Sequence, residues 1–347
     1  MKAHALLPGE AGPERLVGRV LCHDVRDPAG RLLARKGEVL DAAVAARLVA
    51  LDGPELHLLE LEAGDLHEAP AGERLARAVA GEGVEVKGFA GGQWPLAAAR
   101  RGLVAVRAEA LEGVNALPGM SVYTLYHHQV VEAGEVVAKA KVTPLAIAEA
   151  LVAEAEARCR AAGGLVAVRP FRPMKVGAVA KEEIEGPVRE RFRAALAEKL
   201  GWFGSELVHL AFVPATAEAV TGALEACRAR GAELVVAVGA NALDPLDPVF
   251  AGLDRLGARL ARVGVPAHPG SLFWLSRLGE VPVLGMPSCG MFSQATVFDL
   301  VLPRVLAGER LAPADLVALG HGGLLGREMG FRFPPYRRGQ DRGELPE

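Results

Sequence analysis

The sequence predicts an α/β protein whose largest part is a doubly wound, mainly parallel sheet, preceded by α+β and β-rich N-terminal modules. From about residue 173 onward, short apolar runs alternate with helical patterns of about 10 to 15 residues, which is typical of βαβ units. Glycine, proline and asparagine turns separate these runs. The length of 347 residues is enough for two or three domains, at about 100 to 200 residues per domain.

Composition excludes several classes of protein. Lys and Arg number 39 against 42 Asp and Glu, a formal charge of −3, so we expect neither nucleic acid nor a membrane surface as partner. The four cysteines form no CxxC pair, which predicts free thiols rather than a zinc site or disulfides. No secretory signal and no run of about 18 apolar residues is found, so we expect a cytoplasmic protein.

Residues 1–68 predict a small α+β module. Apolar runs between tight turns predict strands, and Asp41 predicts the N-cap of a helix over residues 44–51. The expected strands are residues 16–21, 31–34 and 55–61.

Residues 69–172 predict a β-rich module with a connector helix. A short helix over residues 73–80 comes first, and a helix over residues 145–162 ends at the Gly163-Gly164 stop. The strands expected between them are residues 84–89, 103–106, 121–125 and 136–142.

Residues 173–311 predict the doubly wound domain, and residues 312–347 a C-terminal tail. The Arg-rich stretch 331–338 is expected to be solvated, and the alternative is that its basic side chains serve an anionic ligand. The expected strands are residues 176–180, 207–213, 233–238, 259–263 and 281–286, and the expected helices are residues 188–200, 217–230, 249–256 and 296–306.

Ligands of such a sheet bind outside the carboxyl ends of the strands, and the loop after residues 234–238 carries two carboxylates there. Asp244 and Asp247 could hold a hydrated Mg²⁺ beside a phosphate, while backbone N–H groups at the next helix start hold an anion. The alternative is that both aspartates are caps for the helix that begins near Val249, since Asp before Pro is common in turns.

Two further loops, residues 265–271 and 285–291, place proline and small residues directly after a strand. Each could leave backbone amides free for a phosphate, and each could equally be an ordinary tight loop. We expect His268 to be a loop histidine and Cys289 an inert thiol, because neither has a catalytic partner at motif spacing.

In this order and spacing, residues 235–247, Pro269-Gly270 and residues 283–290 resemble the molybdopterin-binding domain of the molybdopterin adenylyltransferases, the molybdopterin molybdenumtransferases and gephyrin. Residues 185–192 and 130–145 are similar to flanking segments of that family. A variant branch described only as molybdopterin-binding is the most similar.

The resemblance implies that the chain binds molybdopterin or adenylylated molybdopterin in molybdenum cofactor biosynthesis, and that it inserts molybdate with release of AMP if it is an enzyme. It implies Mg²⁺ held by Asp247 and Asp244, which would be the catalytic residues, and a homodimer. The residues implied for the pterin and its phosphate are Gly239, Ala240, Asn241, Pro269, Gly270, Pro287, Ser288 and Gly290.

The alternative function is a non-catalytic carrier or sensor that delivers the cofactor to a molybdoenzyme. Ala240 and Ser288 stand where active members of the family usually carry residues that allow a closer backbone approach to phosphate. The short segment after residue 311 leaves no room for the C-terminal β domain of the molybdenumtransferases. Both departures favour the carrier.

Two histidine clusters occur before residue 173. His23-Asp24 and Tyr126-His127-His128 are expected to be surface or interface residues. Adjacent histidines on a strand point to opposite faces, so His127 and His128 should not share one metal ion.

Overall fold

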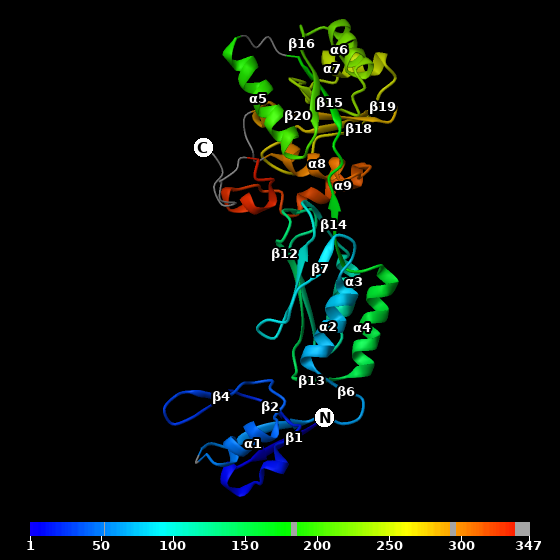
Figure 1. The fold of residues 1–347 in the computed structure, drawn as a ribbon. Helices are drawn as coiled ribbons and strands as arrows, with labels where there is room; N and C mark the ends of the chain where they lie inside the picture. The colour runs from blue at the N-terminus through cyan, green and yellow to red at the C-terminus, as the bar shows by residue number, and fades with distance from the viewer. Residues whose placement is uncertain (52, 182–185, 292–295, 337–347) are drawn as a thin grey trace. The chain divides into compact units, whose positions relative to one another are not determined.

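The computed structural model describes residues 1–51, 53–181, 186–291 and 296–336, and the chain forms two compact units. The first unit contains Met1–Arg100, Val104–Leu125 and Glu132–Val168. The second contains Arg101–Leu103, Tyr126–Val131 and the chain from Arg169 onward (Figure 1). The four segments predicted from the sequence stay predictions.

The N-terminal part of the first unit is a small antiparallel sheet beside one helix. Asp41 caps that helix as predicted, because its side chain accepts a hydrogen bond from Val44 N at 2.7 Å. The elements are β1 (Lys2–Leu6), β2 (Val20–Leu21), β3 (Val25–Arg26), β4 (Leu32–Ala34), α1 (Ala42–Val49) and β5 (Leu56–Glu60), with sheet orders β1-β5-β2 and β3-β4.

The rest of the first unit is β-rich with two long helices, and its helix boundaries differ from the prediction. The first helix begins at Glu68 rather than Glu73, because Pro70 lies in its first turn, where proline is tolerated. The connector helix begins at Glu149, because Ala146–Ala148 pairs as a strand with Asp65–His67. The elements of this part of the chain are β6 (Asp65–His67), α2 (Glu68–Val79), β7 (Val84–Val86), β8 (Trp94–Ala98), β9 (Gly102–Val106), α3 (Ala108–Asn115), β10 (Met120–Thr124), β11 (Val130–Val131), β12 (Val136–Val142), β13 (Ala146–Ala148), α4 (Glu149–Ala162) and β14 (Val166–Pro170). Of these, β11, the start of β9 and the end of β14 belong to the second unit.

The second unit contains a six-stranded sheet of order β16-β15-β17-β20-β19-β18. The first four strands in this order pair in parallel, and β19 and β18 extend the sheet in antiparallel fashion. The elements are β15 (Lys175–Ala180), α5 (Pro187–Trp202), β16 (Glu206–Phe212), α6 (Ala217–Ala229), β17 (Leu234–Val238), α7 (Pro248–Arg255), β18 (Arg259–Val263), β19 (Trp274–Leu278), β20 (Val281–Met286) and α8 (Val297–Leu306).

Helices cover both faces of this sheet, so the prediction of a doubly wound sheet is confirmed within the second unit (Figure 1). Along β17, Val236 and Val238 pack in the core with α5 and α8, whereas Val235 and Ala237 pack in the core with α6 and α7. Strands buried on both faces are continuously apolar, which is why their sequence predicted them.

Strand β19 was not predicted from the sequence, and its antiparallel pairing makes the sheet mixed. Leu278 pairs with Val281 across the two-residue turn Gly279-Glu280, and Trp274 pairs with Gly285. The hairpin therefore inserts one antiparallel strand between β20 and β18.

The expectation of a solvated tail is wrong for the part of residues 331–338 that the structure describes. After α9 (Pro313–Val317), Phe333 and Tyr336 are buried in the core under α5 and α8. The Tyr336 hydroxyl donates to Asp299 Oδ1 at 2.8 Å, and burial raises the pKa of this phenol. Residues 337–347 lie outside the described part.

A buried ion pair holds this region together. Lys199 of α5 donates to Asp299 of α8 at 2.6 Å, and both side chains are almost wholly buried. Asp299 Oδ2 also accepts from the backbone N–H of Thr296 at 3.3 Å and so closes the capping box of α8. One carboxylate therefore joins α5, the start of α8 and the C-terminal segment.

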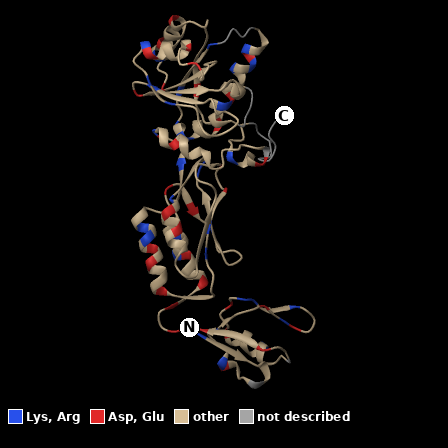
Figure 2. Ribbon diagram, turned by 180° about the vertical axis from the view of Figure 1, so that it is seen from behind, with Lys and Arg blue, Asp and Glu red and all other residues tan. Residues whose placement is uncertain are grey.

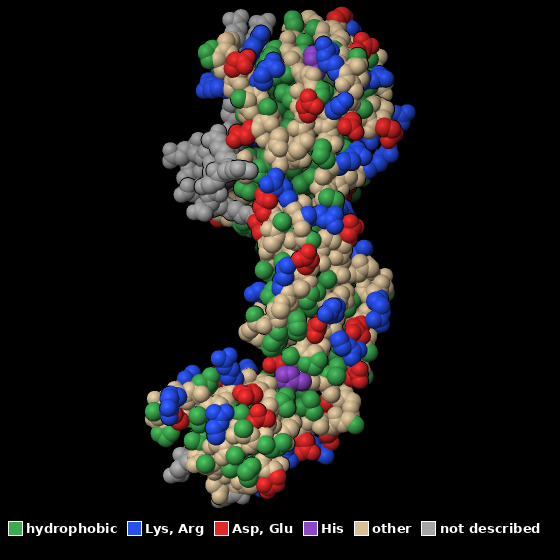
Figure 3. Space-filling view, viewed as in Figure 1, with side chains coloured by type: hydrophobic (Ala, Val, Ile, Leu, Met, Phe, Trp, Pro, Cys, Tyr) green, Lys and Arg blue, Asp and Glu red, His purple; other side chains and the backbone are tan. Residues whose placement is uncertain are grey.

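Charged side chains of both signs are interspersed along the chain. Figure 2 shows acidic and basic residues alternating on the helices of both units, and the face drawn in Figure 3 has both signs side by side. Among the described residues, no helix is long and apolar enough to cross a membrane.

Replacing Lys199 with methionine should lower the free energy of unfolding by about 3 to 5 kcal/mol, because Asp299 would stay buried without its cation. Urea denaturation of the full chain measures this change. Arg228→Met, an exposed change on α6, is the control and should stay within about 0.5 kcal/mol of the parent. Equal stability of Lys199→Met and the control would show that the pair does not hold this region.

Candidate functional site

The candidate site lies where the strand order of the second sheet reverses. The chain passes from β15 to β16 on one side and then, through α6, to β17 on the other side of β15. Ligands of doubly wound sheets bind outside the carboxyl ends of the strands at such a switch point. The ends of β15 and β17, and the loops that follow them, are therefore the expected binding region.

Asp247 and Lys181 meet at this switch point. Lys181 directly follows β15, and its Nζ lies 2.5 Å from Asp247 Oδ2. Asp247 Oδ2 also accepts from Asn241 N at 2.8 Å, and Oδ1 accepts from Val249 N at 2.8 Å. Asp247 is only 2% exposed. Its carboxylate thus joins the end of β15, the loop after β17 and the start of α7.

The contacts of Asp247 confirm the cap alternative for this residue. It is the N-cap of α7, so the helix N–H group that could have held an anion is already occupied. Asp244 is exposed and accepts from Leu246 N at 2.9 Å, a local turn contact rather than a helix cap. The catalytic and metal-binding roles of both residues stay predictions.

The small residues of the first loop shape its path. Gly239 has a φ of +84°, which only glycine adopts readily. Ala240 packs against the core on the α6 and α7 face. Asn241 Oδ1 accepts from Leu243 N at 3.2 Å, and this local hydrogen bond turns the chain within the loop.

The second and third loops meet at the start of α8. Pro269 O accepts from Val297 N at 3.1 Å, and a Cβ on Gly270, whose φ is +109°, would come within 2.9 Å of that nitrogen. Gly290 N donates to Pro287 O, and a Cβ on Gly290 would lie 3.4 Å from Thr296 Oγ1. The other residue implied here, Ser288, is exposed.

All three loops emerge at one edge of the sheet, because β17, β18 and β20 run in the same direction. The predicted residues form two groups there. One group contains Asn241 and Asp247 with Lys181, and the other contains Pro269, Gly270 and Gly290 around the start of α8. Of the similar segment 185–192, residue 185 lies outside the described part, and the remainder leads into α5.

Lys181 is the site residue that the sequence analysis missed. It lies 66 residues before Asp247, so no local motif joins them. A signal was present nevertheless, since Lys181 is the first residue after an apolar strand run. A cation at that position of the first strand of a doubly wound sheet lies beside the binding region.

A resident Mg²⁺ does not fit these residues. Both oxygens of Asp247 accept hydrogen bonds, one of them from an ammonium group. The described residues contain no group of three or more His, Cys, Asp or Glu side chains that could hold a metal ion. Carboxylate oxygens that bind Mg²⁺ need open positions toward the ion, so the predicted ion is not supported.

The two histidine clusters lie in different surroundings. His23 and Asp24 line a pocket of about 320 Å³ in the first unit, where Asp24 Oδ1 accepts from Lys36 N. His127 and His128 are not on a strand but in a turn, and their ring centroids are 3.6 Å apart. The expectation that they point to opposite faces is therefore wrong.

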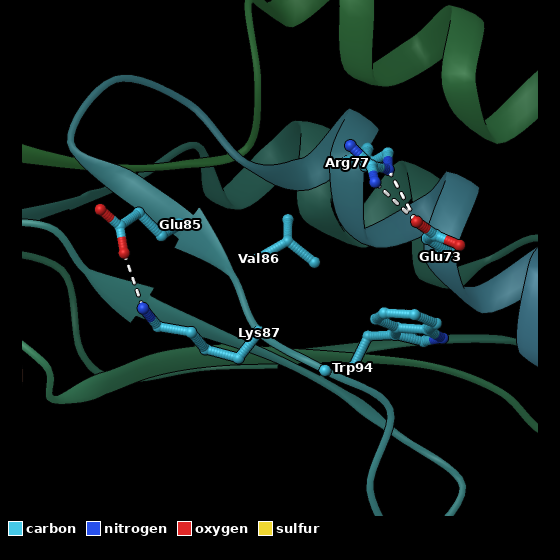
Figure 4. Close-up of a pocket in the computed structure, with 7 residues that line it drawn as sticks. Glu73, Arg77, Glu85, Val86, Lys87 and Trp94 are labelled. Carbon is cyan, nitrogen blue, oxygen red and sulfur yellow. Dashed lines mark hydrogen bonds and ion pairs between the residues drawn. The ribbon is translucent and has the colours of Figure 1, made fainter.

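A second pocket of the first unit, of about 530 Å³, lies beside β7 and α2 (Figure 4). Its charged side chains pair with each other, Glu73 with Arg77 at 2.6 Å and Glu85 with Lys87 at 2.6 Å. Trp94 donates its indole N–H to Ala69 O at 3.0 Å. The pocket is thus lined by side chains already paired with each other and by part of the indole ring of Trp94.

All four cysteines are free thiols, as expected. Burial raises the pKa of Cys159 and of Cys227 to about 11. Their thiolate forms are therefore scarce at neutral pH, and neither suits nucleophilic chemistry.

Replacing Asp247 with asparagine should keep an acceptor for Val249 N but remove the charge that faces Lys181. We expect a loss of about 3 kcal/mol in unfolding free energy and faster hydrogen exchange at the Asn241 amide. Urea denaturation and amide exchange measure both effects. Asp244→Asn is the matched control and should change stability by less than about 0.5 kcal/mol. Equal effects of the two changes would contradict the anchoring role of Asp247.

Comparison with known proteins gives distant structural likenesses only. No family model and no curated protein sequence matches the chain. The molybdopterin biosynthesis MoeA protein from Pyrococcus horikosii is similar at 13% identity and a TM-score of 0.30, covering 88% of this chain and 75% of its own. A MogA structure is similar at 14% identity and a TM-score of 0.26, covering 39% of this chain and 92% of its own. Both TM-scores lie below 0.5.

Proposed function

We propose that the second unit binds the phosphate of molybdopterin or adenylylated molybdopterin at the carboxyl edge of its sheet, in molybdenum cofactor biosynthesis. The observation that carries the proposal is the pairing of Lys181 with Asp247 at the switch point. The loops there are those whose sequence resembles the molybdopterin-binding family.

Lys181 is the group proposed to contact the phosphate. An ammonium group has three donors, so Lys181 can keep its bond to Asp247 and still donate to a phosphate oxygen. Gly239 lets the backbone approach the ligand, and Asn241 is held in place by its N–H bond to Asp247. Asp247 is then a positioning residue.

The finer proposal is that the bound pterin receives molybdate with release of AMP. In this reaction the residues of the first loop hold the phosphate end of the substrate, and those of the second and third loops lie along the same edge. No step is assigned to a metal ion, because the carboxylate that would bind one is already hydrogen-bonded.

A carrier is the second candidate, and two observations favour it. Asp247 is committed to holding Lys181 and the loop. On the same loop, Leu243 and Leu246 are 77% and 84% exposed, and exposed apolar side chains at a binding edge suit contact with a partner protein. A molybdoenzyme or a second copy of this chain is the proposed partner.

Calorimetric titration of the full chain with molybdopterin and with adenylylated molybdopterin tests the proposal. Lys181→Gln should weaken binding by about tenfold or more, because a charge-assisted hydrogen bond to phosphate is lost. Arg228→Gln, at an exposed position of α6, should bind as the parent does. Equal binding by Lys181→Gln and Arg228→Gln would refute the site, and no binding to either pterin would refute the function.

The same complexes separate the enzyme from the carrier. With adenylylated molybdopterin bound, addition of molybdate should release AMP if the chain is an enzyme. A carrier should retain the nucleotide. Titration with and without Mg²⁺ tests the ion independently, and the structure predicts equal affinity in both, since no described group of residues is built to hold it.

A further inference from the structure

A small polar cavity lies within the second unit, where α8 and the C-terminal segment pack. It has a volume of about 50 Å³. Its polar wall is formed by the turn at residues 126–129 with Arg304 and Arg332, and its apolar wall by Leu300 and Leu319. This space holds roughly three to five waters, or one small tetrahedral oxyanion in their place.

The turn that forms one wall has an unusual backbone. His128 has a φ of +66° and is the one non-glycine residue with positive φ among those described. Histidine is unfavourable in this conformation, so the surrounding contacts must hold it. Gln129 N donates to Tyr126 O at 3.1 Å and closes the turn, and the rings of His127 and His128 are in contact at an interplanar angle of 35°.

Glu309 holds the turn in place through a hydrogen bond with His128. Its carboxylate accepts from His128 Nε2 at 3.0 Å, Arg169 Nη1 at 2.9 Å and Arg304 Nε at 2.7 Å. Burial alone would raise the pKa of Glu309. Hydrogen bonds from His128 and Arg304 outweigh this effect and lower the pKa to about 2. Arg304 also pairs with Asp315 at 3.1 Å. The charge of Arg304 is therefore balanced.

Arg332 is different, because no carboxylate balances it within the described residues. It is partly buried and donates through Nη1 to Gly322 O at 2.5 Å. Burial lowers the pKa of Arg332, and the interaction that opposes this effect comes from Tyr126 rather than from a carboxylate. A guanidinium group has five N–H donors. A partly buried cation with donors to spare is a binding group for an anion.

Gln129 adds a second unsatisfied group. It lines the cavity and is only 5% exposed, and its Oε1 is buried without a hydrogen-bond partner. A buried acceptor in this state is costly unless a donor reaches it. The cavity is therefore lined by a cation, which needs an acceptor, and by a glutamine whose buried carbonyl oxygen needs a donor.

We propose that this cavity binds a small protonated oxyanion of the phosphate class, with its charge on Arg332 and a hydroxyl donated to Gln129 Oε1. Among the described residues, the arginines at and beside the cavity (Arg169, Arg304 and Arg332) outnumber the carboxylates that pair with them (Glu309 and Asp315) by one. Burial and the neighbouring His128 lower the pKa of His127 to about 4, so His127 adds no positive charge at neutral pH. The site is distinct from the carboxyl edge and does not depend on the proposed function.

Titration of the full chain with inorganic phosphate tests the proposal, with sulfate as the comparison. Sulfate has the same shape but carries no proton at neutral pH, so it cannot donate to Gln129. We expect saturable phosphate binding, weaker sulfate binding, and a loss of about tenfold or more in phosphate affinity for Arg332→Gln. Gln129→Leu should remove the preference for phosphate over sulfate.

Two controls locate the site. Arg228→Gln, at an exposed position of α6, should bind phosphate as the parent does. Lys181→Gln should keep the binding that depends on Arg332, which separates this cavity from the carboxyl edge. If Arg332→Gln unfolds, Arg332→Lys keeps the cation and should retain part of the affinity, while Gln129→Leu gives an independent measurement. The proposal is overturned by absent phosphate binding, by equal phosphate and sulfate binding, or by affinity lost in Lys181→Gln but kept in Arg332→Gln.

Discussion

The carboxylate of Asp247 is the interaction on which the carboxyl edge depends. A buried anion is costly unless hydrogen bonds or a cation satisfy it, and here two backbone N–H groups and one ammonium group do so. The donors come from three places: the end of β15, the loop after β17 and the first turn of α7. Because one group holds all three, the position of Lys181 and the path of the loop are not independent. A change at Asp247 alters the site even if no ligand touches this residue.

Much of the fold could be predicted because its strands and helices carry local patterns. The apolar runs of β15 and β17 are continuous, as expected for strands covered on both faces, and Asp41 and Asp247 mark helix starts. Elements whose position depends on distant contacts were missed. The strand β19 is fixed by pairing of Trp274 with Gly285, and Tyr336 is held by Asp299 of α8. The arginines around Tyr336 suggested solvent, whereas burial of the aromatic rings prevailed.

The candidate site was only partly predictable for the same reason. Spacing identified Asp247 as a residue of interest but left its role open between metal ligand and cap, and the contact with Val249 N identifies the cap. Lys181 required the topology, since only the pairing of β15 with β17 brings it to the loop. His127 and His128 were predicted to lie on a strand. The structure places them in a turn with a positive φ at His128, and a histidine in the sequence does not indicate a positive φ.

The two polar sites of the second unit differ in how their cations are balanced. At the carboxyl edge, Lys181 is already paired with Asp247, and the first turn of α7 is capped by the same carboxylate. The phosphate proposed to bind there would therefore meet a neutral ion pair and gain little long-range electrostatic attraction. Recognition there must come from close contacts, including backbone groups and the exposed leucines of the loop. In the cavity beside α8, Arg332 has no carboxylate partner within the described residues, so a small anion is favoured by charge itself. The proposed selectivity, for a large ligand at the edge and for a small anion in the cavity, rests on this difference.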